Sequence, residues 1–119
     1  MTPKIFESEY RFCKILWEHE PINSTELVRL CREQLGWSKA TTYTVIRRLA
    51  ERGVLKNEEA TVSSLISREE AEGAEIEALV QSRFDGSLPA FIAAFSRKKH
   101  LTEAQAAEIL AMIDDAEEV

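Results

Sequence analysis

The chain has 119 residues, of which 45% are hydrophobic and 30% are charged, and its formal net charge at pH 7 is −6. With only four Gly and three Pro, this composition excludes long disordered linkers and predicts a folded protein. No apolar run approaches the roughly 20 residues of a membrane span, and the N-terminus lacks the apolar segment of a secretory signal, so we expect a cytoplasmic protein without a membrane partner.

Two amphipathic helices are predicted at the start of the chain. In the first, over residues 7–20, apolar side chains recur at helical spacing, and a proline follows. The second begins after Asn23, a candidate N-cap that forms a variant of the capping box with Glu26. This helix is expected to run to about Leu35, because Gly36 is typical of a helix end.

A third helix and a hairpin are predicted next. Ser38 is the candidate N-cap of the helix, which continues to Arg52 before a glycine stops it. Residues 54–57 and 61–66 have the pattern of two short strands around a turn at residues 58–60. Three helices followed by a hairpin predict a winged helix-turn-helix, in which the hairpin is the wing and the third helix contacts DNA.

The remainder of the chain is predicted to form three more helices. Ser67 and Glu70 form a capping box for a helix that reaches Phe84, a shorter helix covers residues 88–97, and a last one starts at Thr102. Helices this thin cannot bury their own apolar stripes, so we expect a second copy of the chain to cover them. The expected dimer interface consists of Leu79, Phe84, Phe91, Ile92, Phe95, Ile109, Leu110 and Ile113.

These elements predict a mainly α fold in two parts. We expect a winged-helix DNA-binding domain over residues 1–66 and a helical dimerisation domain over residues 67–119. Residues 1–56 hold ten Lys and Arg against seven Asp and Glu, whereas residues 57–119 hold five against fourteen. A basic first part can face phosphate, and an acidic remainder limits nonspecific association with DNA.

The third helix has two contrasting faces. One, which we expect to pack inward, consists of Thr42, Val45, Ile46 and Leu49. The other, with its flanks, consists of Ala40, Thr41, Tyr43, Thr44, Arg47 and Arg48. This second face has no carboxylate before Glu51, and its short hydroxyls and guanidinium groups suit base edges and phosphates in a major groove. An ordinary solvated helix face is the alternative.

No catalytic, cofactor or metal site is predicted. The chain lacks a phosphate-binding glycine loop and a nucleophile elbow, so we do not expect an enzyme. Cys13 and Cys31 lie in apolar helical patterns and are expected to be reduced core thiols. His19 and His100 have no neighbouring ligands at metal spacing and are expected to be solvated.

Four segments together resemble a known family. They are SEYRFCKILW at residues 8–17, INSTELV at residues 22–28, ATTYTVIRRL at residues 40–49 and RGVL at residues 52–55. In order and spacing they resemble the penicillinase and methicillin-resistance repressors and their copper-responsive relatives, the BlaI/MecI/CopY type. The resemblance implies a homodimer that binds a pseudo-palindromic operator in double-stranded DNA and represses antibiotic-resistance or related genes.

The resemblance also assigns roles to the third helix. The family often has basic residues at the positions of Ala40 and Tyr43, so this departure points to a different operator. Arg47 and Arg48 are implied as phosphate or flanking contacts. The residues implied to face the bases are Ala40, Thr41, Tyr43 and Thr44.

The wing and the C-terminal helices carry the remaining expectations. Lys56 at the base of the wing can contact DNA, whereas Glu58 and Glu59 would repel phosphate. In the antibiotic-responsive relatives a sensor-linked protease prompts cleavage, and the similar position here is between Ala94 and Phe95. An aromatic side chain in a dimer core explains Phe95 equally well. A winged-helix protein-interaction module without DNA binding is the alternative function, and the acidic wing favours it.

Overall fold

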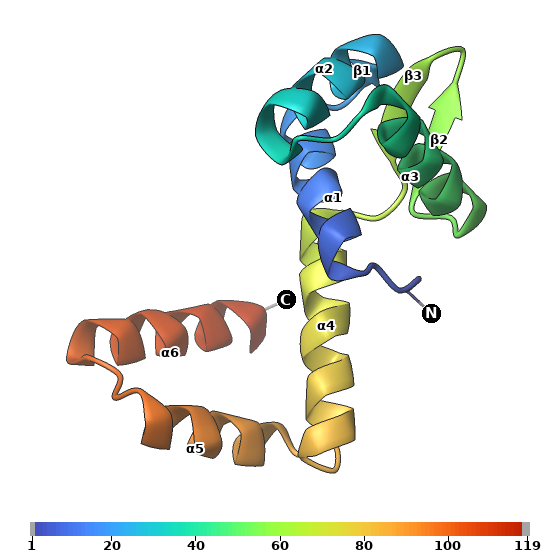
Figure 1. Cartoon of the computed structure of the whole chain (residues 1–119). Helices are drawn as coiled ribbons and strands as arrows, with labels where there is room; N and C mark the ends of the chain where they lie inside the picture. The colour runs from blue at the N-terminus through green and yellow to red at the C-terminus, as the bar shows by residue number, and fades with distance from the viewer. Residues whose placement is uncertain (1, 118–119) are drawn as a thin grey trace. The chain divides into compact units, whose positions relative to one another are not determined.

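The computed structural model (Figure 1) describes residues 2–117, and in them the chain forms six helices and three strands. The predicted mainly α fold with a small antiparallel sheet in its first half is confirmed. In chain order the elements are α1 (Glu7–His19), β1 (Ile22–Asn23), α2 (Ser24–Leu35), α3 (Lys39–Glu51), β2 (Leu55–Glu58), β3 (Thr61–Ser64), α4 (Arg68–Arg83), α5 (Leu88–Lys98) and α6 (Glu103–Glu117).

The chain divides into two compact units within α4. The first unit ends at Ile76 and the second begins at Glu77, so the division falls later than the boundary expected after Ile66. The reason is packing: Ala71, in the first turn of α4, is only 4% exposed and belongs to the core of the first unit. The start of α4 is therefore part of the winged-helix unit.

The first unit encloses one hydrophobic core between its helices and the sheet. Each of α1, α2 and α3 turns one apolar stripe inward, because its apolar residues recur every three or four positions. Phe12 also stacks on Trp37, with ring centroids 6.0 Å apart and ring planes 6° apart, which ties α1 to the turn between α2 and α3. The largest side chains with less than 2% exposure include Phe12, Leu16, Leu27, Leu49, Val54, Leu55 and Val62.

The helix-turn-helix begins and ends at residues with capping roles. The Asn23 side chain accepts a hydrogen bond of 2.9 Å from the Thr25 amide, as an N-cap should. Gly36 ends α2 with a φ of 70°, a conformation that glycine adopts without a steric cost. Ser38 Oγ accepts from the Thr41 amide at 3.1 Å and starts α3. The capping box predicted for Glu26 is wrong, because its carboxylate bonds to Arg29 instead.

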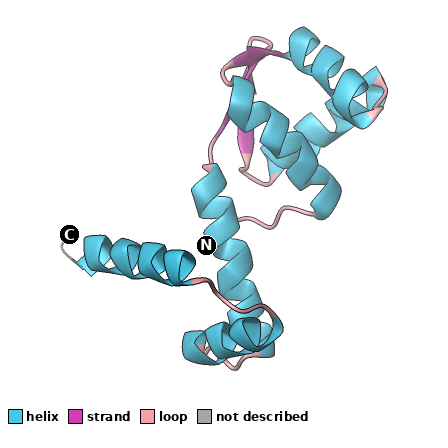
Figure 2. Cartoon of the chain, turned by 90° about the vertical axis from the view of Figure 1, so that its left-hand side faces the viewer, coloured by secondary structure: helices cyan, strands magenta, loops and turns pink. Residues whose placement is uncertain are grey.

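The sheet has the strand order β1-β3-β2, with both pairs antiparallel. Its strands are magenta in Figure 2. β1 has only two residues, too few for a sequence signal, and it pairs Ile22 with Val62. Glu58 pairs with Thr61 in the wing, so the turn consists of Glu59 and Ala60 alone and is shorter than predicted. Both turn residues have positive φ, 51° and 63°, as the central residues of a type I′ hairpin turn do; the usual Asn-Gly signal is absent.

Two polar contacts attach the wing and the following linker to α1. The Glu20 carboxylate accepts hydrogen bonds from the Ser64 amide at 2.7 Å and from the Ser64 hydroxyl at 2.8 Å. Trp17 Nε1 donates to the Ile66 carbonyl at 2.9 Å. Because these three bonds join residues more than forty positions apart, they fix the end of β3 against the first helix.

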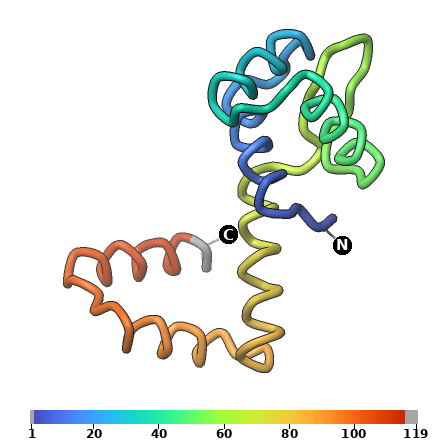
Figure 3. Tube along the Cα trace, viewed as in Figure 1, coloured from blue at the N-terminus to red at the C-terminus, as the bar shows by residue number. Residues whose placement is uncertain are grey.

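The second unit consists of the end of α4 followed by α5 and α6, whose path Figure 3 traces. Ser87 caps α5 by accepting from the Ala90 amide at 3.1 Å. Thr102 and Gln105 form a reciprocal capping box at the start of α6, with bonds of 3.0 and 3.1 Å. Phe84 and Phe91 meet edge to face with centroids 5.5 Å apart. This contact joins the end of α4 to α5.

Candidate nucleic-acid interface

The inward face of α3 is buried as its sequence pattern predicts. Thr42 and Leu49 are fully enclosed, Ile46 is 2% exposed and Val45 is 9% exposed. The Thr42 hydroxyl is satisfied inside the core, because it donates to the Ser38 carbonyl at 3.0 Å. This packing fixes the rotation of α3, and therefore determines which of its side chains face outward.

The outward face of α3 holds most of the residues predicted to contact DNA. Ala40, Thr41, Arg47 and Arg48 are exposed, and Thr44 is half-buried. The Thr41 hydroxyl accepts from the Ser38 hydroxyl at 3.0 Å, so its proton remains able to donate. Over residues 40–48, about two and a half helical turns, the face brings together small side chains, hydroxyls and two guanidinium groups. Such a surface can approach a DNA groove closely.

Tyr43 is placed differently from its neighbours on α3. Its ring is half-buried and packs against the core of the unit, and its hydroxyl donates to Ser24 Oγ at 3.2 Å. Ser24 is the first residue of α2 and is 4% exposed. The polar end of Tyr43 therefore joins α3 to α2. Helical periodicity could not predict this role, because the partner lies on another helix.

The wing presents one lysine among acidic residues. Lys56 is exposed, and its Nζ lies 3.8 Å from a carboxylate oxygen of Glu58, two positions along the same strand. Glu59 is exposed in the turn. Neighbouring carboxylates reduce the positive potential that the lysine offers to phosphate, although an exposed pair at this distance is weak.

A polar cluster at the end of α3 has no counterpart among the predicted site residues. Glu9 is 7% exposed; its carboxylate accepts from the Phe6 amide at 2.9 Å and forms an ion pair with Arg52. Arg52 also donates to the Lys4 carbonyl at 2.8 Å, and its guanidinium lies 5.4 Å from the centre of the Phe6 ring. Glu9 lies three positions before Phe12 and four before Cys13, on the buried stripe of α1. This spacing is the one feature of the sequence that indicates a buried position for Glu9.

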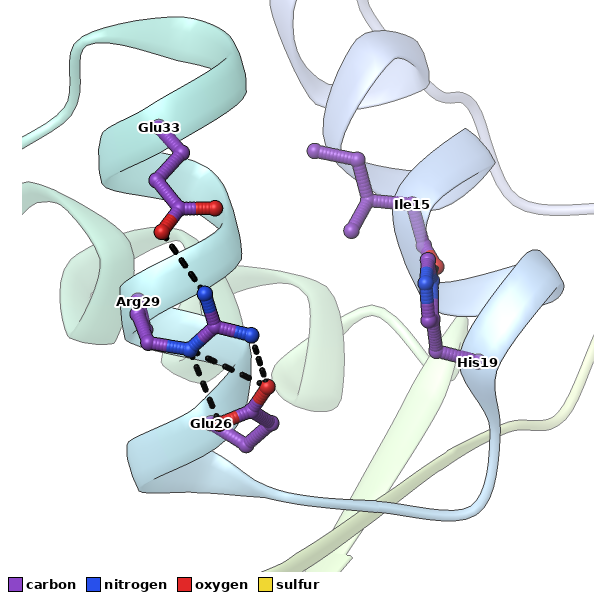
Figure 4. A network of polar contacts seen from close by, with 5 residues as sticks. All are labelled: Ile15, His19, Glu26, Arg29 and Glu33. Carbon is purple, nitrogen blue, oxygen red and sulfur yellow. Dashed lines mark hydrogen bonds and ion pairs between the residues drawn. The ribbon is translucent and has the colours of Figure 1, made fainter.

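A second charged cluster lies on α2 and appears in Figure 4. The Arg29 guanidinium bonds to Glu26 and, at 2.6 Å, to Glu33, on either side of it along the helix. The hydrogen bonds from Arg29 lower the pKa of Glu26, and both carboxylates raise the pKa of Arg29. Nearby on α1, His19 is exposed and its Nδ1 lies 2.9 Å from the Ile15 carbonyl oxygen.

The two cysteines are buried free thiols, as predicted. Burial raises the pKa of Cys13 to about 12 and that of Cys31 to about 11, and the nearby Glu9 carboxylate adds to the rise at Cys13. Both thiols are therefore protonated near neutral pH and poor nucleophiles. Within residues 2–117, no group of three or more His, Cys, Asp or Glu side chains is placed to hold a metal ion.

The second unit exposes most of the residues predicted to form the dimer interface. Phe84 and Phe91 are half-buried against each other. Ala94 is half-buried and Phe95 is half exposed, and both lie inside α5, so the predicted cleavage position is helical. The remaining predicted interface residues are between 40% and 61% exposed: Leu79, Ile92, Ile109, Leu110 and Ile113.

The residues that the structure describes include no helix with the length and apolar character of a membrane span.

Comparisons with known proteins agree with this architecture. A family profile described as Penicillinase repressor matches residues 5–115. The Penicillinase repressor of Bacillus licheniformis is 31% identical over 55 residues, 46% of this chain and 43% of that protein. An "Uncharacterized 16.5 kDa protein in ptsI 3'region" of Latilactobacillus sakei is 35% identical over 57 residues, 48% of this chain and 39% of that protein.

Each of these two matches spans less than half the length of the relative. The family profile, in contrast, covers α1 through most of α6. Its extent confirms the resemblance carried by the four sequence segments. The chain therefore belongs to the penicillinase repressor family, whose members are DNA-binding transcriptional repressors.

Proposed function

We propose that this chain is a transcriptional repressor that binds a pseudo-palindromic operator as a homodimer, with α3 in the major groove. The observation that carries the proposal is the outward face of α3, where Thr41, Arg47 and Arg48 are exposed while the opposite face is locked into the core. Membership of a family of DNA-binding repressors supports it.

The contacts divide by chemistry. Ala40, Thr41 and Thr44 are small enough to let the helix backbone approach base edges, including a thymine methyl group. Arg47 and Arg48 can bond guanine bidentately or bind phosphate. In this arrangement Tyr43 holds α3 against α2, since its hydroxyl is bonded to Ser24 of α2.

Dimerisation is proposed through the second unit. Its apolar side chains, such as Ile92, Leu110 and Ile113, are about half exposed or more in a single chain. A second copy related by a two-fold axis would cover the same side chains on both subunits. The paired units would then set the separation of two α3 helices at about one turn of DNA.

Relief of repression belongs to the same proposal. A sensor-linked protease that cuts between Ala94 and Phe95 would break α5, and Phe95 lies among the exposed apolar residues of the second unit. Loss of the dimer would release the operator, because one α3 alone contacts only one half-site. Antibiotic-resistance or related genes are the proposed targets of this control.

The direct test is selection of random duplex DNA by the purified protein, followed by titration of the selected sequence at two salt concentrations. An enriched inverted repeat bound with salt-dependent affinity supports the proposal. The variant Arg47→Ala should then weaken operator binding by about 1–3 kcal/mol, whereas Arg68→Ala, which removes a charge on α4 that is paired with Glu72, should not. No enriched sequence and negligible binding would instead favour the protein-interaction module.

A further inference from the structure

We propose that the groove between α2 and α3 binds the sugar-phosphate backbone of the operator, with Arg32 and Lys39 as its phosphate contacts. The inference rests on the proposed DNA binding and adds two residues that the sequence pattern of α3 does not indicate. The groove has a volume of about 250 Å³ and is lined by Thr25, Val28, Arg29, Arg32, Lys39 and Tyr43.

The lining residues come from one face of each helix. The four from α2 recur at intervals of three and four, and Lys39 and Tyr43 are one turn apart on α3. The hydrogen bond from Tyr43 to Ser24 fixes the two helices against each other at the groove. Lys39 also directly precedes Ala40 and Thr41, which are proposed to face bases. A DNA strand bound at those two residues would therefore pass close to the groove between α2 and α3.

The three cations of the groove are not electrically equal. The Arg29 guanidinium bonds to two carboxylates, those of Glu26 and Glu33 (Figure 4), so its charge is already compensated. Among the residues that the structure describes, Arg32 and Lys39 form no ion pair, and both are exposed. Their charges are therefore available to a ligand.

A DNA phosphate suits this groove for two reasons. The first turn of α3 contains no acidic residue, so the positive end of its helix dipole adds to the charge of Lys39. Backbone contacts beside a groove-binding helix set the register of the protein on the duplex and carry no sequence information. The groove and the outward face of α3 would thus have separate tasks in one complex.

The test measures the affinity of the full chain for its selected operator and for an unrelated duplex over a range of salt concentrations. Arg32→Ala and Lys39→Ala should each weaken binding to both duplexes by the same factor. Each should reduce the slope of log K against log salt concentration by about 1 per subunit. Lys14→Ala is the matched control, because it removes an exposed charge on α1, beside the Tyr10 ring.

A gain of affinity provides the complementary test. The double variant Glu26→Gln, Glu33→Gln releases the Arg29 charge, and it should bind both duplexes more tightly with a steeper salt slope. If wild type binds DNA but Arg32→Ala and Lys39→Ala behave like the Lys14→Ala control, the groove proposal is wrong while the repressor proposal stands. A loss confined to the selected operator also overturns it, because it indicates base contacts. Absence of wild-type binding to any duplex overturns the repressor proposal itself.

Discussion

In the first unit most large apolar side chains are enclosed, whereas in the second unit most of them are exposed. Phe12, Leu27 and Leu49 have no exposed surface, but Leu110 and Met112 are each 61% exposed. Both units have amphipathic helices with ordinary caps, so local helix formation does not account for the difference. The first unit contains a sheet in addition to its helices, whereas the second unit consists of the end of α4 and two helices. Burial therefore depends on how many elements surround each apolar stripe.

The contrast is sharpest for a large core side chain. Phe12→Ala removes a fully buried ring that stacks on Trp37, and it should lower the free energy of unfolding by about 3–5 kcal/mol. Urea titration measures the loss. Phe6→Ala is the matched control, because Phe6 is 54% exposed and its removal should cost much less. Equal losses of unfolding free energy in the two variants would contradict the conclusion that enclosed apolar side chains stabilise the first unit.

The second unit should respond in association rather than in folding. Leu110→Asp places a charge on the exposed apolar face of α6, and it should raise the dissociation constant of the proposed dimer by at least about a hundredfold, or roughly 2.7 kcal/mol. Sedimentation equilibrium measures this change, with Glu108→Ala on the same helix as the control. A dimer of unchanged stability in Leu110→Asp would show that this face is not the one a second copy covers.

A smaller effect is expected at the polar cluster of the first unit. Glu9→Gln keeps the shape of the side chain but removes the charge that faces Arg52, and it should cost roughly 1–3 kcal/mol. Glu7→Gln, at an exposed position two residues earlier, should leave stability nearly unchanged. If thermal unfolding of the two variants coincides, the ion pair contributes little and apolar packing alone holds the first unit.

An effect of pH on stability is also expected. Burial raises the pKa of Cys13 to about 12 and that of Cys31 to about 11, above the ordinary thiol value of 9.0. The folded state thus disfavours the thiolates, so the contribution of these groups is complete below pH 9 and is lost as pH rises through the folded pKa values. Urea titrations at pH 8 and pH 10.5 should show a decline that is smaller in the double variant Cys13→Ala, Cys31→Ala. Identical declines would mean that the thiols are not the cause.

Local signals predicted much of the fold. Asn23, Gly36 and Ser38 determine where helices begin and end through their own side chains or φ values, so they act within a few residues and can be recognised in the sequence. The buried face of α3 likewise follows from its spacing. The outward face follows by exclusion, which is why Arg47 and Arg48 could be placed without a structure.

Contacts between distant segments escaped prediction. β1 depends on pairing with β3, some forty residues later. Tyr43 bonds to α2, and Arg52 bonds to Glu9 and to the segment before α1. The end of the first unit inside α4 follows from the burial of Ala71, which its own sequence pattern does not show. In each case the partner is fixed by the tertiary fold and not by neighbouring residues.

The position of Trp37, which stacks on the core residue Phe12, and of Trp17, both in the first unit, also has a spectroscopic consequence. Both tryptophans, Trp17 and Trp37, and both tyrosines lie in the first unit, and the second unit contains only phenylalanine among the aromatic residues. Intrinsic fluorescence excited near 295 nm, where indole alone absorbs, therefore reports the unfolding of the winged-helix unit and not that of the second unit. A fluorophore placed on α6 would report the proposed dimerisation in the same experiment, at a separate emission wavelength.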